Sequence, residues 1–111
     1  MIPFNVFAKN CPSRQVFSHV TGRWGSLVLG RLTPEPQRFC ELRVQIEGIS
    51  DRMLTQTLKT LVNDGLVART MSDGRPSHPE YALTAAGAEV AHAVRALVVA
   101  VQDNMPAPAV D

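Results

Sequence analysis

The sequence predicts a mainly α-helical domain with a small β-hairpin wing, arranged as a winged helix-turn-helix with extra N- and C-terminal dimerisation helices. Three observations between Arg38 and Leu83 favour this fold. Two short stretches have apolar residues at helical spacing, and a turn containing glycine joins them. Two strand-like stretches follow, and a polar loop separates them. This order of elements is that of a helix-turn-helix followed by a hairpin.

The composition fits a single small domain. The chain has 111 residues, which is enough for one hydrophobic core. Its net charge of +1 does not identify a nucleic-acid partner, but one basic face can be balanced by acids elsewhere. The longest apolar run, Ala96–Val101, is far too short to span a bilayer, and we expect no signal peptide. Two cysteines do not make a disulfide framework, so we expect reduced thiols and a cytoplasmic location.

We expect three parts along the chain: an N-terminal arm at residues 1–10, a domain at residues 11–104 and a flexible tail at residues 105–111. The arm carries several apolar side chains, which a free arm would expose to water. We therefore expect the arm to pack against another part of the protein. These apolar residues are Ile2, Phe4, Val6 and Phe7.

Two helices are predicted before the helix-turn-helix. The first is expected from about Ser13 to Val20, because Pro12 suits the first helical position, where its missing N–H costs nothing. The second ends before the loop at residues 33–36, which contains two prolines and cannot stay helical. Each helix has one apolar face, formed by Val16, Phe17 and Val20 in the first and by Trp24, Leu27, Val28 and Leu32 in the second.

The helix-turn-helix itself is predicted at residues 39–63. Its first helix is expected at about 39–46, after a short strand at residues 38–39. A turn at residues 47–49 follows, and Ser50 is a suitable N-cap for the second helix. Gly65 can adopt the positive φ that ends a helix. The inward-facing residues are Phe39, Leu42 and Ile46 in the first helix and Leu54, Leu58, Leu61 and Val62 in the second.

The hairpin is predicted from the next residues. The stretch 66–70 is expected to form one strand, and Tyr81–Leu83 begin the return strand. The residues between them include Gly74 and Pro76, which are typical of turns. We therefore expect a hairpin with an extended loop, the wing.

A long helix is expected from about Ala85 to Gln102, with Thr84 as its N-cap. Val99 and Ala100 extend its apolar character beyond the expected core face. A surface helix of a monomer is not usually apolar so far round its circumference. We therefore expect a second face to pack against another subunit. The expected core face consists of Ala86, Val90, Ala93, Val94, Leu97, Val98 and Val101.

The polar face of the helix at residues 50–63 carries the chemistry of DNA recognition. Glutamine can pair bidentately with adenine and arginine with guanine, and threonine can touch a thymine methyl group. Lysine and hydroxyl groups reach phosphates, as do the free N–H groups after Ser50. The alternative is an ordinary solvated helix face, but the preceding turn and the following wing favour DNA binding. The residues concerned are Ser50, Arg52, Thr55, Gln56, Lys59, Thr60 and Asn63.

Other basic residues are candidates for phosphate contacts. Arg75 lies at the expected wing tip, where it either enters a minor groove or serves as a solubilising charge. Arg69 is a weaker candidate in the wing. Arg23 either contacts phosphate or is solvated. Trp24 is expected in the core, because its spacing to the following apolar residues is structural.

The chain resembles the HxlR-type family of winged helix-turn-helix regulators. The resemblance runs from Cys11 to about Leu97, and the motifs occur in the family's order: Cys11-Pro12, Gly22-Arg23-Trp24, residues 38–42 (RFCEL), residues 48–56 (GISDRMLTQ), Leu58, Leu61, residues 64–67 (DGLV) and residues 81–84 (YALT). It implies a cytoplasmic homodimeric transcription regulator whose terminal helices form the dimer interface. It also implies that residues 50–63 form the recognition helix and that the wing comprises residues 71–80.

The resemblance also implies a role for Cys11, the position that the family uses to sense oxidants or electrophiles. Cys11 lies at a helix start between Lys9 and Arg14, and this favours a thiolate. The alternative is a half-buried residue retained for packing. Two positions depart from the family's pattern: Arg23 stands where lysine is frequent, and Cys40 stands where a small or polar residue is usual.

The sequence thus predicts a sequence-specific, DNA-binding transcriptional regulator that acts as a homodimer on double-stranded DNA, at an operator with two half-sites. A thiol-reactive or small-molecule effector is also expected. The alternative is a winged-helix protein-interaction module without specific DNA binding. We expect no enzyme, no cofactor and no metal, because His19, His78 and His92 have no ligand spacing with each other or with the cysteines.

Overall fold

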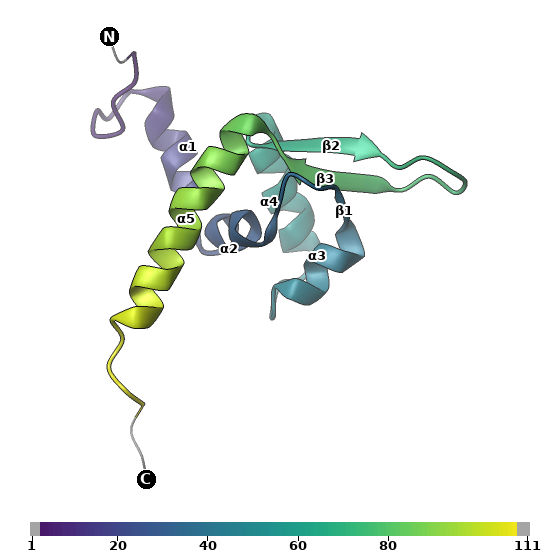
Figure 1. Cartoon of the computed structure of the whole chain (residues 1–111). Coiled ribbons are helices and arrows are strands. Elements are labelled where there is room, and N and C mark those ends of the chain that lie inside the picture. The colour runs from purple at the N-terminus through teal and green to yellow at the C-terminus, as the bar shows by residue number, and fades with distance from the viewer. Residues whose placement is uncertain (1–2, 109–111) are drawn as a thin grey trace.

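Helices form most of the computed structural model, which describes residues 3–108 (Figure 1). The ends of the expected arm and tail, residues 1–2 and 109–111, lie outside the described residues. Within them the elements follow the predicted order, each expected boundary lying within two residues of the observed one. They are α1 (Pro12–Thr21), α2 (Arg23–Arg31), β1 (Gln37–Arg38), α3 (Phe39–Gln45), α4 (Asp51–Asn63), β2 (Val67–Met71), β3 (Pro79–Leu83) and α5 (Ala85–Asp103).

The hydrophobic core lies between α2, α3, α4 and the start of α5. In α4 the leucines recur at i, i+4 and i+7, so they fall on one side of the helix and are almost fully buried. Trp24 is half-buried and packs against the core, as predicted. The largest fully buried side chains are Val28 and Leu29 from α2, Leu32 directly after it, Leu42 from α3, and Leu54, Leu58 and Leu61 from α4.

The sheet has three antiparallel strands in the order β1-β3-β2. Strands β2 and β3 form the predicted hairpin, in which Val67 is opposite Leu83. The short first strand is one residue earlier than expected, because Phe39 already belongs to α3. The Arg38 amide donates to the Glu41 carboxylate at 2.8 Å, which ends the strand and caps the helix.

The predicted turns and caps around α4 are confirmed. Gly48 and Gly65 have φ values of +87° and +81°, which favour glycine. The Ser50 hydroxyl accepts a hydrogen bond from the Met53 amide at 3.1 Å, as an N-cap should. Helix α4 therefore begins and ends at well-defined residues.

The expected core face of α5 is wrong in most of its residues. The residues buried in α5 are Gly87, Ala91 and Val94. A Cβ atom on Gly87 would lie only 1.8 Å from the Leu66 carbonyl oxygen, so α5 approaches the start of β2 very closely. The small residues on this side of α5 allow the close approach. Because this side faces the core, the larger side chains of α5 point outward. Of the expected face, Val94 is buried and Val90 packs on the core, whereas Ala86, Ala93, Leu97, Val98 and Val101 are exposed.

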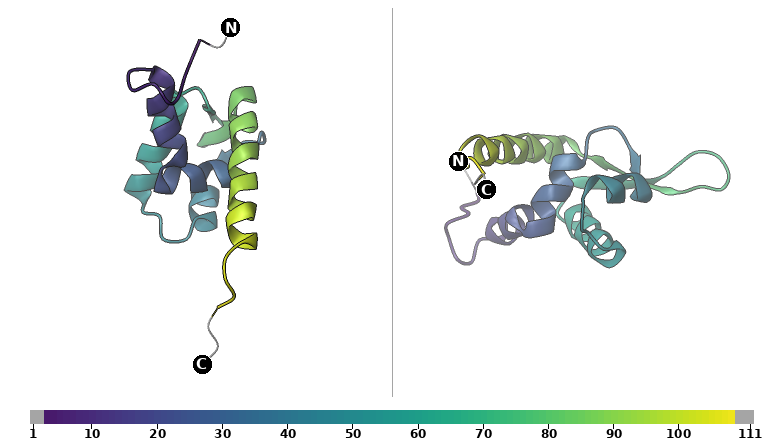
Figure 2. Two further views of the ribbon diagram at one scale, coloured as in Figure 1. Left: turned by 90° about the vertical axis from the view of Figure 1, so that its left-hand side faces the viewer. Right: turned by 90° about the horizontal axis from the view of Figure 1, so that it is seen from below.

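The described part of the arm packs only partly. Phe7 is 91% exposed, whereas Phe4 and Val6 face a groove between α1 and α5. A turn connects the arm to α1, with the Ala8 amide donating to the Asn5 carbonyl. The left view of Figure 2 shows α1 and α5 on one side of the molecule, and the right view shows the wing projecting away from them.

Candidate nucleic-acid interface

The outward side of α4 forms a shallow polar concavity of about 630 Å³. Because the leucines of α4 point into the core, the intervening polar side chains point to solvent. Six of the predicted DNA-binding residues meet here, and all are exposed except Thr60, which is half-buried. We call this surface the α4 polar face, and it consists of Asp51, Arg52, Thr55, Gln56, Lys59, Thr60 and Asn63.

An exposed ion pair links α3 to the start of the α4 polar face. The Arg43 Nε atom of α3 lies 3.2 Å from the Asp51 carboxylate, so the two helices of the helix-turn-helix are joined across their turn. Asp51 also stands at the positive end of the α4 dipole, where a carboxylate is favourable. Ser50 does not line the concavity, since its hydroxyl caps the helix. No local pattern in the sequence pairs Arg43 with Asp51, so this contact was not predicted.

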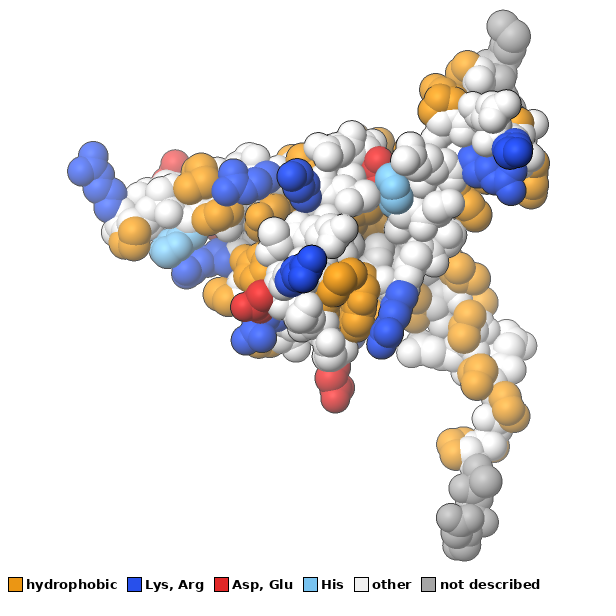
Figure 3. Space-filling view, turned by 180° about the vertical axis from the view of Figure 1, so that it is seen from behind, with side chains coloured by type: hydrophobic (Ala, Val, Ile, Leu, Met, Phe, Trp, Pro, Cys, Tyr) orange, Lys and Arg blue, Asp and Glu red, His pale blue; other side chains and the backbone are white. Residues whose placement is uncertain are grey.

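The wing holds its two arginines apart from the α4 polar face. Arg75 is exposed in the loop between β2 and β3, and Arg69 is exposed on β2. The Ser72 hydroxyl accepts from the His78 amide at 2.9 Å, and the Ser77 hydroxyl donates to the Ser72 carbonyl at 2.7 Å. These bonds close the base of the loop and present its tip to solvent. In Figure 3, lysine and arginine side chains extend from this tip across the helical part of the molecule, with few acidic ones among them.

Arg23 is stacked on its neighbour. Its guanidinium carbon lies 4.6 Å from the centre of the Trp24 ring, which is a cation–π distance. Trp24 Cη2 in turn lies 4.0 Å from where a Cβ on Gly48 would be, in the turn before α4. The exposed Arg23 is therefore oriented by a side chain that packs beside the helix-turn-helix.

Cys11 lies at the N-cap of α1 and is partly exposed. Its sulfur is 3.1 Å from the Ser13 hydroxyl, and the Asn5 amide donates to it at 3.2 Å. The Ser13 hydroxyl, followed by the Asn5 amide, lowers the pKa of the Cys11 thiol below its ordinary value. Lys9 and Arg14 line the same shallow depression beside the sulfur. The lowered pKa favours the thiolate, and it comes from the Ser13 hydroxyl and the Asn5 amide rather than from the charges of Lys9 and Arg14 on which the expectation rested.

Cys40 is exposed on α3. Among residues 3–108, no group of three His, Cys, Asp or Glu side chains is arranged to hold a metal ion.

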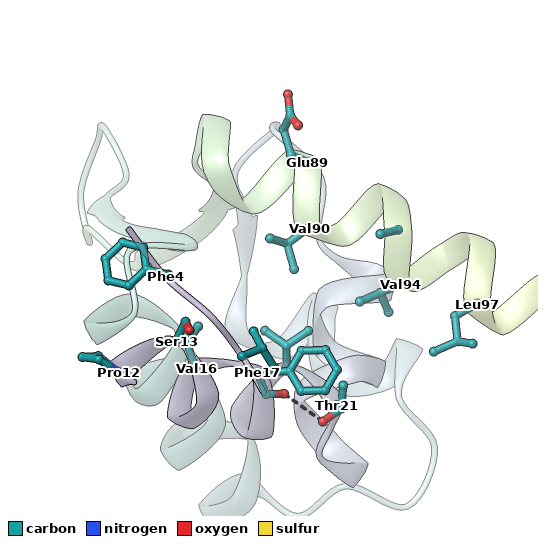
Figure 4. A pocket seen from close by; sticks show the side chains of 13 residues that line it. Phe4, Pro12, Ser13, Val16, Phe17, Thr21, Glu89, Val90, Val94 and Leu97 are labelled. Atoms are coloured by element: carbon teal, nitrogen blue, oxygen red, sulfur yellow. Dashed lines mark hydrogen bonds between the residues drawn. The ribbon is translucent and has the colours of Figure 1, made fainter. Parts of the chain in front are cut away.

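An apolar groove of about 740 Å³ separates α1 from α5 (Figure 4). Phe4 from the arm closes one end, Phe17 and Val16 of α1 form one wall, and Val90 and Leu97 of α5 form the other. Beyond the groove the C-terminal half of α5 exposes Val98, Val99 and Val101, and Met105 is exposed just after the helix. Val99 belongs to the apolar second face that was expected on α5, whereas Val98 and Val101 were expected in the core.

Helix α5 is long and apolar enough to cross a membrane, judged by length and composition only. Its packing is that of a domain helix. Gly87 lies against the Leu66 backbone, and the Arg95 side chain donates to the Leu32 carbonyl at 3.4 Å.

A contact between α1 and α4 was not predicted. His19 Nδ1 lies 2.8 Å from an Asp64 carboxylate oxygen, at the C-terminal end of α4. The two residues are 45 positions apart, and only the fold brings them together.

The chain matches the family model described as HxlR-like helix-turn-helix over residues 19–108. It is 44% identical over 102 residues to an uncharacterized HTH-type transcriptional regulator, YtfH of Escherichia coli, covering 92% of this chain and 81% of the relative.

Solved structures agree with this match. The transcriptional regulator YtfH of Salmonella typhimurium has a TM-score of 0.81 and 42% identity, covering 91% of this chain and 90% of that one. The redox regulator HypR in its oxidized form has a TM-score of 0.76 and 28% identity, covering 87% of this chain and 100% of that one. Together with the geometry of α3, α4 and the wing, these matches show that the chain belongs to the HxlR-like helix-turn-helix family of transcriptional regulators.

Proposed function

We propose that this protein is a sequence-specific DNA-binding regulator that acts as a homodimer in the cytoplasm. The observation that carries the proposal is the α4 polar face. Arg52, Gln56 and Lys59 project from one helix that is capped at its start and anchored by leucines on its other side. Arginine and glutamine can read guanine and adenine in the major groove, and lysine can bind phosphate. Thr55 and Thr60 supply hydroxyl and methyl contacts beside them.

The other basic residues take supporting roles in this proposal. Arg75 at the wing tip reaches the minor groove, where its charge is attracted to the narrow, negative cleft. Arg69 and Arg23 contact phosphates, and Ser50 presents the α4 N-terminus to a phosphate. Such contacts position the protein on the duplex without selecting a sequence.

The dimer is proposed from the apolar surface of α1 and α5. The groove and the exposed C-terminal half of α5 form a continuous apolar region that also includes Phe4 and Phe17. Surfaces of this kind mark interaction sites, because exposure of a large apolar area to water is unfavourable in free energy. A second copy of the chain would cover this region and place two α4 helices in successive major grooves, at two half-sites.

A thiol-dependent response is proposed for Cys11. The HypR structure is that of a redox regulator, and here the lowered pKa favours a reactive thiolate. The thiolate attacks one oxygen of a peroxide, giving a sulfenic acid and releasing hydroxide or alkoxide. The added oxygen would change the size and polarity of the acceptor that the Asn5 amide meets, at the junction between the arm and α1. A small apolar effector in the groove would act on the same elements.

A protein-interaction module without specific DNA binding is the alternative. The α4 polar face argues against it, since a protein-binding helix usually offers aromatic or aliphatic anchors. Electrophoresis with generic DNA at low salt separates the two, because a module of this kind would not retard the DNA.

Gel shifts with the promoter region beside the protein's own gene test the proposed function. We expect a specific band whose affinity falls steeply between low and physiological salt, because phosphate contacts release counterions. Light scattering in the same buffer should give the mass of a dimer. A folded dimer without any specific band on this DNA contradicts the proposal.

A further inference from the structure

The His19–Asp64 contact joins α1 directly to the end of the recognition helix. The nitrogen–oxygen distance is 2.8 Å, and the Asp64 side chain is only 10% exposed. The His19 side chain is 31% exposed, so the pair is shielded from water mainly on the aspartate side. Helices α1 and α4 thus have a polar link in addition to their apolar contacts.

This link is not explained by the stability of α4 alone. A carboxylate at the C-terminal end of a helix meets the negative end of the helix dipole, which is unfavourable. Burial of the Asp64 carboxylate adds a cost of desolvation unless a donor satisfies it. The His19 ring N–H is that donor. The helix is already ended by Gly65, whose φ is +81°. The structural role of Asp64 is therefore to bind His19 of α1, rather than to stabilise α4.

The same junction is also tied to α5. The Thr84 hydroxyl donates to the Gly65 carbonyl at 2.7 Å, and the Thr84 amide donates to the Leu66 carbonyl at 3.1 Å. The end of α4 is thus held by both helices that form the apolar groove. The direction of α4 is consequently fixed relative to that groove.

Small changes in this direction matter on DNA. Helix α4 has 13 residues and is therefore about 20 Å long. A tilt of about 10° about one end would move the other end by about 3 Å, which is close to the roughly 3.4 Å rise per base pair. A displacement of this size in each subunit would change the half-site spacing that the dimer can bind.

We propose that His19 and Asp64 are positioning residues that determine the half-site spacing selected by the dimer, without touching DNA. The proposal rests on the proposed function, because it requires a DNA-binding dimer joined through α1 and α5. The contact holds α4 at one angle to the dimer surface. Without it, α4 samples several angles, and several spacings bind with similar affinity.

The experiment uses half-sites that the wild-type protein selects from random DNA. Paired half-sites are then made with spacers that differ by one base pair, and affinities are measured under reducing conditions. The wild type should prefer one spacing. In His19→Leu and Asp64→Ala proteins, the affinity ratio between the best and second-best spacing should fall at least fivefold. His19→Asn is the matched control, because its side-chain amide can donate from nearly the position of His19 Nδ1, and it should restore the preference.

Circular dichroism and light scattering confirm that each variant is a folded dimer. The inference is overturned when His19→Leu and Asp64→Ala are both folded dimers that prefer the same spacing as the wild type, with the same affinity ratio between the best and second-best spacing. It is equally overturned when both fail to fold, since the contact then serves stability rather than positioning. Failure of the proposed function is seen separately, in a wild-type protein that selects no DNA.

Discussion

The hydroxyl group of Thr84 donates a 2.7 Å hydrogen bond to the carbonyl oxygen of Gly65, across 19 positions of the chain. The same hydroxyl accepts a bond from the Gly87 amide at 3.0 Å and so caps α5. One side chain therefore joins the start of α5 to the end of α4.

Replacement of Thr84 by valine should lower the free energy of unfolding by about 1–2 kcal/mol, because the cap and the bond to Gly65 are lost together. Urea denaturation followed by circular dichroism measures this change. Thr84→Ser keeps the hydroxyl and should lose much less. Equal losses for the two variants would show that the hydroxyl is unimportant.

Gly87→Ala should destabilise the protein although alanine favours helices. A Cβ atom at this position would lie 1.8 Å from the Leu66 carbonyl oxygen, so α5 must move away from β2. We expect a loss of roughly 1–3 kcal/mol from this overpacking. Gly30→Ala is the control, because a Cβ on Gly30 meets nothing within 4 Å and should stabilise α2 by up to about 1 kcal/mol. In thermal melts the melting temperature should fall for Gly87→Ala and rise for Gly30→Ala, and a rise for both would contradict the overpacking at Gly87.

Gln56→Ala and Lys59→Ala should weaken DNA binding in different ways. Gln56 can pair with a base, so its loss should relax sequence preference at one position by about 1–3 kcal/mol. Lys59 can pair with phosphate, so its loss should weaken all sequences alike and reduce the salt slope by about one. Competition assays with single-base operator variants separate the two effects. Unchanged sequence preference in Gln56→Ala would exclude it from base recognition.

Leu97→Glu should weaken the proposed dimer. Leu97 is 58% exposed and lines the apolar groove, so a second subunit would have to bury the introduced charge. The dissociation constant should rise at least about tenfold, which corresponds to roughly 1.4 kcal/mol. Analytical ultracentrifugation measures it. Ala86→Glu adds a charge in the first, exposed turn of α5, outside the groove, and should leave the dimer intact.

Ser13→Ala should make Cys11 less reactive at neutral pH. The Ser13 hydroxyl is the main cause of the lowered pKa of the Cys11 thiol, so its removal raises that pKa toward the ordinary value. A higher pKa leaves less thiolate at a given pH, and the pH profile of alkylation should shift to higher pH. Iodoacetamide kinetics in a Cys40→Ser background report on Cys11 alone. An unshifted profile would contradict the role of Ser13.

The structure agrees with the prediction where the apolar periodicity of a helix defines only one possible inward face. Leu54, Leu58 and Leu61 define a single inward face for α4, so its polar face could be predicted. Helix α5 is apolar on several sides, and its periodicity therefore allows more than one inward face. Close packing of Gly87 and Ala91 decides between them, and that depends on the backbone of β2.

Polar contacts between distant parts of the chain were not predictable in the same way. His19 and Asp64 each look like ordinary surface residues in the sequence, since no local motif contains both of them. Their pairing depends on how α1 packs across α4, which tertiary structure alone determines.

The exposed apolar side of α5 has a consequence for gene control. In a dimer joined through this side, the amount of DNA-binding species varies with the square of the subunit concentration while most subunits are free. Doubling the rate of synthesis would then raise the dimer about fourfold. Genes under such a regulator would respond steeply to how much of it the cell makes, before any oxidant or ligand acts.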